Sequence, residues 1–157
     1  MGTAQQRNVP ANSDGGMGAA LNVFVADTYV LLAKTQACHW NATGPDFYAF
    51  HKLTEAQYGE LFEAVDVLAE RVRALRWPAP SGLAAMLELS TLEEDDGSVE
   101  THEAARVLAR DHGAMADYAR ELASEAGEAN DPATQDLLVG RIEVHEKAAW
   151  LLRSHLP

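Results

Sequence analysis

Five side chains of metal-binding types follow one another at helical spacing in the first half of the chain: His39, His51, Glu55, Asp66 and Glu70. His51 and Glu55 are four residues apart, as are Asp66 and Glu70, and this spacing puts two side chains on one face of a helix. Mixed imidazole and carboxylate ligands suit Fe(II), Zn(II) or Mn(II). The sequence offers no cysteine cluster and no His-Glu-x-x-His motif as a competing site. Each pair could therefore hold one ion.

The two pairs are too far apart to share an ion within one subunit. Fifteen residues separate His51 from Asp66, which is roughly 22 Å along a helix that rises ~1.5 Å per residue. Either the pairs serve separate purposes, or Asp66 and Glu70 of one subunit meet His39, His51 and Glu55 of another. A twofold axis that crosses the helix near its middle would build two identical sites.

A purely structural role for these residues is an open alternative. A lone histidine on a helix is more often a core or surface residue than a ligand, and Asp66 and Glu70 could pair with Arg71 and Arg73 on a solvated face. This alternative predicts no specific metal uptake.

The elements that must position these residues are helices. Apolar residues recur at helical spacing in four long segments, and no stretch shows sustained period-two alternation. The segments cover residues 18–43, about 47–75, 98–127 and 132–157, with a short apolar piece at 83–89. We expect Asp46, Ser98 and Asp131 to be N-caps, and the apolar stripe of the second helix to bury Phe47 and Phe62. The fold class is therefore all-α: a four-helix bundle with a short extra helix between the second and third helices.

Length and composition predict one domain, at residues 18–157, after a flexible N-terminal tail, 1–17. The tail lacks the apolar core of a signal peptide, no apolar run approaches the roughly 20 residues of a membrane helix, and Cys38 alone cannot form an internal disulfide. We expect a soluble cytoplasmic protein with no membrane partner. Twelve Lys and Arg against 24 Asp and Glu give a net charge of −12, which should attract cations and repel nucleic acid.

Three runs of the sequence resemble the Dps family, the ferritin-like proteins of starved bacterial cells. The first signature is matched by residues 34–51, the second by residues 65–71, and the C-terminal pattern by residues 145–153. The resemblance covers roughly residues 18–156. It implies a ferritin-like four-helix bundle that assembles into a hollow dodecameric shell with ferroxidase centres at twofold interfaces. Such centres oxidise Fe(II), preferentially with hydrogen peroxide, and the ferric mineral is stored inside.

The resemblance assigns a role to each of the five residues. His39 and His51 match the imidazole ligands of the family, and Asp66 and Glu70 match the carboxylates that the neighbouring subunit supplies. Glu55 stands where the family usually has Asp; it keeps the charge and adds a methylene, which can displace the site or change its affinity.

Three further residues match the family more loosely. Trp40 corresponds to a tryptophan near the site that can take up oxidising equivalents, with core packing as the alternative role. Asp131 and Asp136 lie in the region whose acidic residues line threefold pores for iron entry, although a residue just before Pro132 is also an ordinary N-cap.

The resemblance thus predicts a ferroxidase that takes Fe(II) and hydrogen peroxide or oxygen as substrates, with iron as its metal. The main alternative is a nucleoid-associated protein that coats DNA, although the tail has one arginine and no lysine. Two further hypotheses are a structural bundle without chemistry and a redox-inert zinc-storing shell. The remaining histidines have no partners at convincing spacing and are expected to be surface or core residues: His102, His112, His145 and His155.

Overall fold

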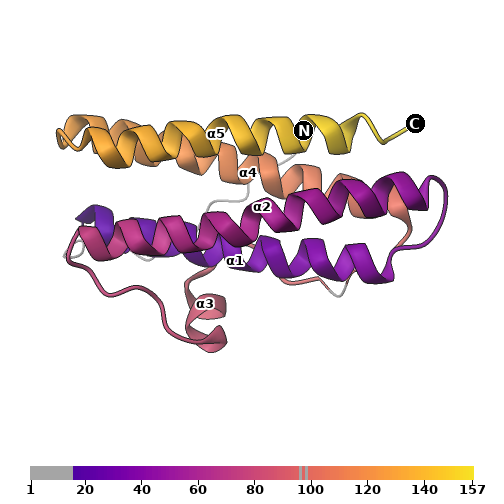
Figure 1. Ribbon diagram of the computed structural model, residues 1–157, viewed down its shortest axis with the longest axis horizontal. Coiled ribbons are helices and arrows are strands. Elements are labelled where there is room, and N and C mark those ends of the chain that lie inside the picture. The colour runs from indigo at the N-terminus through magenta and orange to yellow at the C-terminus, as the bar shows by residue number, and fades with distance from the viewer. Residues whose placement is uncertain (1–15, 96, 98) are drawn as a thin grey trace, which may run out of the picture.

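The computed structural model describes residues 16–95, 97 and 99–157. Within these residues the chain forms five helices: α1 (Gly16–Asn41), α2 (Phe47–Ala74), α3 (Leu83–Leu89), α4 (Thr101–Glu128) and α5 (Pro132–Arg153). One hairpin is made of α1 and α2 and the other of α4 and α5, and the hairpins pack mainly through α1 against α4 (Figure 1). The short helix α3 lies in the α2–α4 connection and packs on α1. The all-α four-helix bundle with one extra short helix is confirmed.

Two of the predicted helix starts differ from the structure. Asp46 stands at the N-cap of α2, but it has a positive φ of 55° and its side chain makes no capping hydrogen bond, so this predicted cap is wrong. Helix α4 begins at Thr101 with Glu100 at its N-cap, and Ser98 lies outside the described residues. The cap of α5 is confirmed: Asp131 accepts a hydrogen bond from the Thr134 backbone N–H, with proline at the first helical position.

The predicted tail is described only at its end. Residues 1–15 lie outside the described residues, and α1 already begins at Gly16, two residues before the expected start of the domain. The flexibility expected of the tail stays a prediction.

Helix α2 ends in a reversal that uses an arginine where glycine is the usual residue. The Arg76 N–H donates to Arg73 O and the Trp77 N–H donates to Val72 O, while Arg76 has a φ of 62°. The Trp77 side chain then packs on Gly18 of α1, where a Cβ atom would approach it to 2.6 Å. The close approach of α1 to the end of α2 therefore needs a glycine at position 18.

Helix α1 is the central helix of the core. Leu21, Phe24, Val25 and Leu31 are fully buried in it. By length and composition alone α1 could cross a membrane, with a mean hydropathy of 1.5 over its most apolar window, so the expectation that no apolar run comes near this limit does not hold. Because 67% of that window is buried inside the bundle, its apolar character is that of a core helix.

The link between α1 and α2 is fastened to the start of α4. Thr43 pairs with Glu100 in an isolated parallel bridge, in which the Thr43 N–H donates to Val99 O at 3.3 Å and the Thr101 N–H donates to Thr43 O at 2.9 Å. The Thr101 hydroxyl donates to Pro45 O at 2.6 Å. These bonds hold the end of α1 and the beginning of α2, and therefore the histidines that lie there, in one arrangement.

Candidate metal centre

His39 at the end of α1 and His51 in the first turns of α2 form a reciprocal pair. His39 Nδ1 lies 2.9 Å from His51 O, and His51 Nδ1 lies 3.0 Å from His39 O. The rings stack with centroids 3.7 Å apart and an angle of 14° between their planes. Because a carbonyl oxygen only accepts, each Nδ1 must carry its proton and donate it. Nε2 is then the ring nitrogen that each histidine can offer to a metal ion, as in histidines whose other ring nitrogen is held by a carbonyl.

The surroundings of His39 hold its ring in place. Its side chain is buried, the Thr54 hydroxyl lies 3.2 Å from its Nδ1, and the Tyr58 ring meets it edge-on at 5.1 Å between centroids. Phe47 packs at 5.4 Å against His51. Thr54 and Tyr58 were not among the predicted site residues, although their spacing of three and seven residues from His51 puts them on the same face of α2.

Glu55 lies near both imidazoles and is engaged by a lysine. Its Oε2 accepts a hydrogen bond from Lys52 Nζ at 2.6 Å, and both side chains are exposed. The Lys52 ammonium is the main reason that the pKa of Glu55 is lowered, and His39 and His51 lower it further. Glu55 is therefore a carboxylate at neutral pH, close enough to the histidines to interact with them electrostatically.

Asp66 and Glu70 lie toward the other end of α2, and the chain does not bring them to the histidines. Because α2 is one helix from Phe47 to Ala74, the separation of roughly 22 Å follows directly from its rise. Within the described residues neither carboxylate has an ion-pair partner at 4 Å or less. The two arginines expected as alternative partners are used elsewhere: Arg71 pairs with Asp131 at 2.7 Å, and Arg73 donates to a backbone carbonyl. The predicted alternative, in which these arginines neutralise the acid pair, is therefore wrong.

Trp40, next to His39, is 66% exposed in the single chain. Its expected alternative role, packing in the core of the bundle, is wrong because the residue lies on the outer side of the last turn of α1. Trp40 lies beside the histidine half of the site, and its redox role stays a prediction.

Asp131 and Asp136 occupy the start of α5, as expected. Asp131 is the N-cap, and its pKa is lowered because its carboxylate accepts hydrogen bonds from Thr134 and Arg71, which outweighs partial desolvation. Asp136 is exposed, as is Glu128 at the end of α4. The N-cap role of Asp131 is confirmed, and a role of either aspartate in a pore stays a prediction.

The four remaining histidines form two groups that the sequence spacing does not indicate. His112 of α4 and His145 of α5 are buried against each other, with their Nδ1 atoms 2.9 Å apart. Burial lowers the pKa of His112 to about 3 and that of His145 well below its usual value. This pair has the expected core role. His102 and His155, for which no partner was expected, lie together with Asp46.

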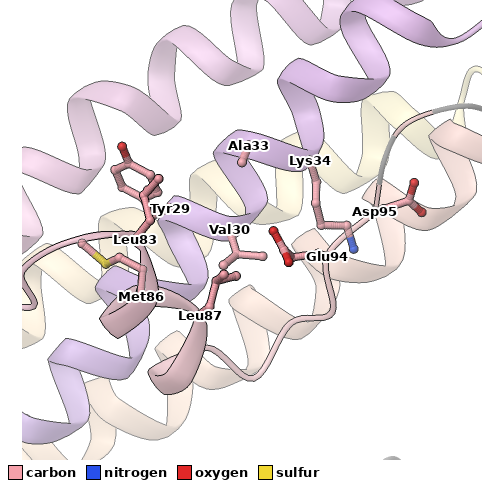
Figure 2. A pocket seen from close by; sticks show the side chains of 9 residues that line it. All are labelled: Tyr29, Val30, Ala33, Lys34, Leu83, Met86, Leu87, Glu94 and Asp95. Atoms are coloured by element: carbon pink, nitrogen blue, oxygen red, sulfur yellow. The ribbon is translucent and has the colours of Figure 1, made fainter.

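A separate pocket lies between α1, α3 and the loop that follows α3. It has a volume of about 190 Å³. Figure 2 shows Tyr29 and Met86 at one end and Lys34, Glu94 and Asp95 at the other. The Lys34 ammonium is held by Asp111 at 2.5 Å. The pocket includes none of the five predicted ligands, so it is not the metal centre.

Comparison with known sequences shows the family of the chain. A model of the ferritin-like domain matches residues 18–157. A DNA protection during starvation protein from Brevibacillus brevis is 33% identical over 136 residues, which cover 87% of this chain and 91% of that protein. An uncharacterized low temperature-induced protein from Nostoc is 38% identical over 138 residues, which cover 87% of this chain and 77% of that protein.

Solved structures agree with the sequence relatives. The crystal structure of a Dps protein from Bacillus brevis superposes with a TM-score of 0.86 at 32% identity, over 90% of this chain and 95% of that one. The Dps protein from Vibrio cholerae, described as a member of a broad superfamily of ferritin-like diiron-carboxylate proteins, gives a TM-score of 0.85 at 27% identity, over 90% and 89% of the two chains. The bundle, the family model and these relatives together show that this chain belongs to the Dps family of ferritin-like proteins.

Proposed function

We propose that this chain is a ferroxidase and iron-storage subunit whose dinuclear iron centre forms between two copies of the chain. The observation that carries the proposal is the presence of two incomplete half-sites on one unbroken helix. The histidine half-site (His39, His51 and Glu55) can offer two imidazole nitrogens, and the carboxylate half-site (Asp66 and Glu70) has two acids without a neutralising partner among the described residues. Antiparallel pairing of two α2 helices would join each histidine half-site to a carboxylate half-site.

The face of α2 between the half-sites is suited to such pairing. Phe62 is 69% exposed, so the prediction that Phe62 is buried is wrong for the single chain, as it is for Phe47 at 41%. Burial of Phe62 against its twofold copy would explain why its position follows the apolar stripe.

The half-sites divide the chemistry between them. The neutral imidazoles bind ferrous ions, and the carboxylates stabilise the ferric state because their charge compensates the added positive charge. Two Fe(II) ions give up one electron each to hydrogen peroxide, whose O–O bond breaks, and two protons complete two water molecules. Iron is the substrate of this reaction. Consumption of ferrous iron and peroxide together would limit oxidative damage, which fits the name of the starvation-protection relatives.

The proposal also covers the assembly of the chains and the route by which iron enters. We expect a homo-oligomeric shell, a dodecamer by family resemblance, that holds ferric mineral in the cytoplasm. The acids near the turn between α4 and α5, among them Glu125, Glu128 and Asp136, would raise the local concentration of cations at an entry route. Asp131 is less suited to this task because Arg71 neutralises it.

A mixing experiment tests the shared centre. One variant, Asp66→Asn with Glu70→Gln, lacks the carboxylate half-site, and a second, His51→Gln, lacks a histidine ligand. Each assembly alone should oxidise Fe(II) with peroxide little faster than buffer does. If the variants are unfolded together and reassembled at equal amounts, about a quarter of the centres combine two intact halves, so about a quarter of the wild-type rate should return. A centre formed within one chain predicts no recovery and would refute the proposal.

Two controls accompany the mixing experiment. Glu63→Gln changes an exposed acid of α2 that belongs to neither half-site and should keep the wild-type rate. Separate assays with peroxide and with air measure which oxidant the centre prefers, and a soluble mineral that co-elutes with a large particle supports storage.

A direct role in coating DNA is the competing proposal. The net charge of −12 opposes it, since binding to DNA draws its affinity from basic side chains that displace counterions. The absence of a mobility shift of DNA at low salt would rule out the competing role, and a shift that persists at physiological salt would support it.

A further inference from the structure

Asp46, His102 and His155 gather at one end of the bundle. They belong to the link between α1 and α2, the first turn of α4, and the segment after α5, and their ligand atoms all lie within 4.8 Å of one another. We propose that these three side chains form a second metal site, separate from the ferroxidase half-sites, for a divalent ion that prefers imidazole, of which Zn(II) is the representative. Two imidazoles and one carboxylate match the protein ligands of open zinc sites.

The backbone segments that carry the three ligands are held together by hydrogen bonds and packing. The hydrogen bonds of Thr43 and Thr101 keep the link that carries Asp46 beside the start of α4. The His155 N–H donates to Leu152 O at 3.1 Å, which turns the chain back at the end of α5. The His155 ring packs against Phe50 at 5.6 Å and against His102 at 5.9 Å between centroids. The cluster is therefore built from packed elements rather than from a loose surface.

A buried nitrogen in this cluster has no hydrogen-bond partner. His155 Nε2 is inaccessible to solvent and unbonded within the described part of the chain. Because a buried polar atom without a partner costs free energy, native structures usually satisfy it, and a bound cation would do so here.

Glu100 adds negative charge beside the cluster. Its Oε1 lies 3.7 Å from His102 Nδ1 and 2.9 Å from the Thr101 hydroxyl oxygen. A carboxylate close to a ligating imidazole orients the ring and raises its basicity. Asp46 and Glu100 together balance the two positive charges of the ion.

The distances fit a site that closes slightly around its ion. Metal–ligand bonds of about 2.0–2.1 Å in a tetrahedral arrangement place ligand atoms about 3.4 Å apart, compared with up to 4.8 Å here. Asp46 is exposed and His102 is partly exposed, so rotation of their side chains can supply this contraction. Water would take the fourth position.

A zinc titration of the assembled protein, followed by calorimetry, tests the site. Wild-type protein should bind one more Zn(II) per chain than His155→Gln and than His102→Gln, which remove ligands from different elements. Zn(II) should also raise the thermal midpoint of wild-type protein more than that of either variant. Asp46→Asn, which changes an exposed residue, serves if a histidine variant does not fold, and Glu103→Gln is the matched control in the first turn of α4.

The outcome is independent of the proposed ferroxidase activity. Since the variants leave both half-sites intact, they should oxidise Fe(II) with peroxide at the wild-type rate. Equal zinc stoichiometry in wild-type protein, His102→Gln and Asp46→Asn would overturn the second site, whatever the oxidation assay gives. Loss of oxidation with unchanged zinc binding would count against separate sites in the same way.

Discussion

The buried histidine pair of α4 and α5 should make the protein less stable as the pH falls below neutrality. His112 and His145 lie in the core, and burial is the main cause that lowers both pKa values, that of His112 to about 3. In the unfolded chain a histidine has a pKa near 6.5. Below that pH the unfolded state binds protons at these histidines and the folded state does not. The stabilisation that the neutral pair contributes is therefore complete above pH 6.5 and is lost as the pH falls toward 3.

The expected loss follows from these two pKa values. Between pH 7.5 and pH 5, His112 alone should cost the folded state about 2 kcal/mol, because the unfolded chain then takes up a proton at a site that stays neutral in the core. His145 shifts in the same direction and adds to the loss. Arg141 increases the effect, since its guanidinium lies 3.3 Å from His145 Nε2 and opposes a second positive charge there.

Urea unfolding at pH 7.5 and pH 5, at one fixed protein concentration, measures the effect. The matched variant is His112→Leu with His145→Leu, which removes both groups while all carboxylates stay. Between the two pH values its free energy of unfolding should change less than that of wild-type protein. The difference between the two changes should be at least the about 2 kcal/mol expected of His112. Identical pH dependence in the two proteins would refute the argument that both imidazoles stay neutral in the core.

Three further predictions concern charged side chains and their partners. Lys34→Met should destabilise the bundle by less than the about 3–5 kcal/mol of a buried charge left without a partner, because Arg110 still pairs with Asp111 at 2.9 Å. Lys34→Met with Asp111→Leu should recover much of the loss in thermal unfolding, and equal loss in both would contradict this. Asp131→Ala should lower the free energy of unfolding by about 1 kcal/mol, because the N-cap of α5 is lost. The difference should shrink in acid, since the pKa of Asp131 is lowered in the folded chain and the stabilisation disappears once the carboxylate is protonated. Urea unfolding at two pH values checks this. Lys52→Met should tighten Zn(II) binding at the histidine half-site by a few-fold, since it removes the ammonium that competes with the metal ion for Glu55. Weaker binding in calorimetry would contradict this prediction.

The sequence predicted the helices well because their signals are local. Apolar periodicity located the long helices to within a few residues, and the Asp131-Pro132 pair predicted a cap that the structure confirms. Asp46 failed as a cap because its backbone takes a positive φ in the turn that follows Gly44 and Pro45. Residue type alone does not show that dihedral angle.

The candidate site was predictable in its residues but not in its geometry. The reciprocal bonds between His39 and His51 depend on how the link of the α1–α2 hairpin folds, and no spacing rule predicts that fold. Phe62 fits an apolar stripe, yet periodicity cannot distinguish a face covered by the same chain from one left for a partner. His102 and His155 are distant in sequence, so only the packing of α4 against α5 brings them together, and the bonds between the α1–α2 link and α4 add Asp46.

The unbroken helix α2 acts as a spacer of fixed length. In the proposed pair, one residue inserted between His51 and Asp66 would lengthen the spacing by only ~1.5 Å but would rotate the carboxylates by about 100° around the helix axis. They would then point away from the partner's imidazoles, even though every ligand was still present. In the proposed pair, the centre therefore depends on the number of residues between the two half-sites as well as on the ligands themselves.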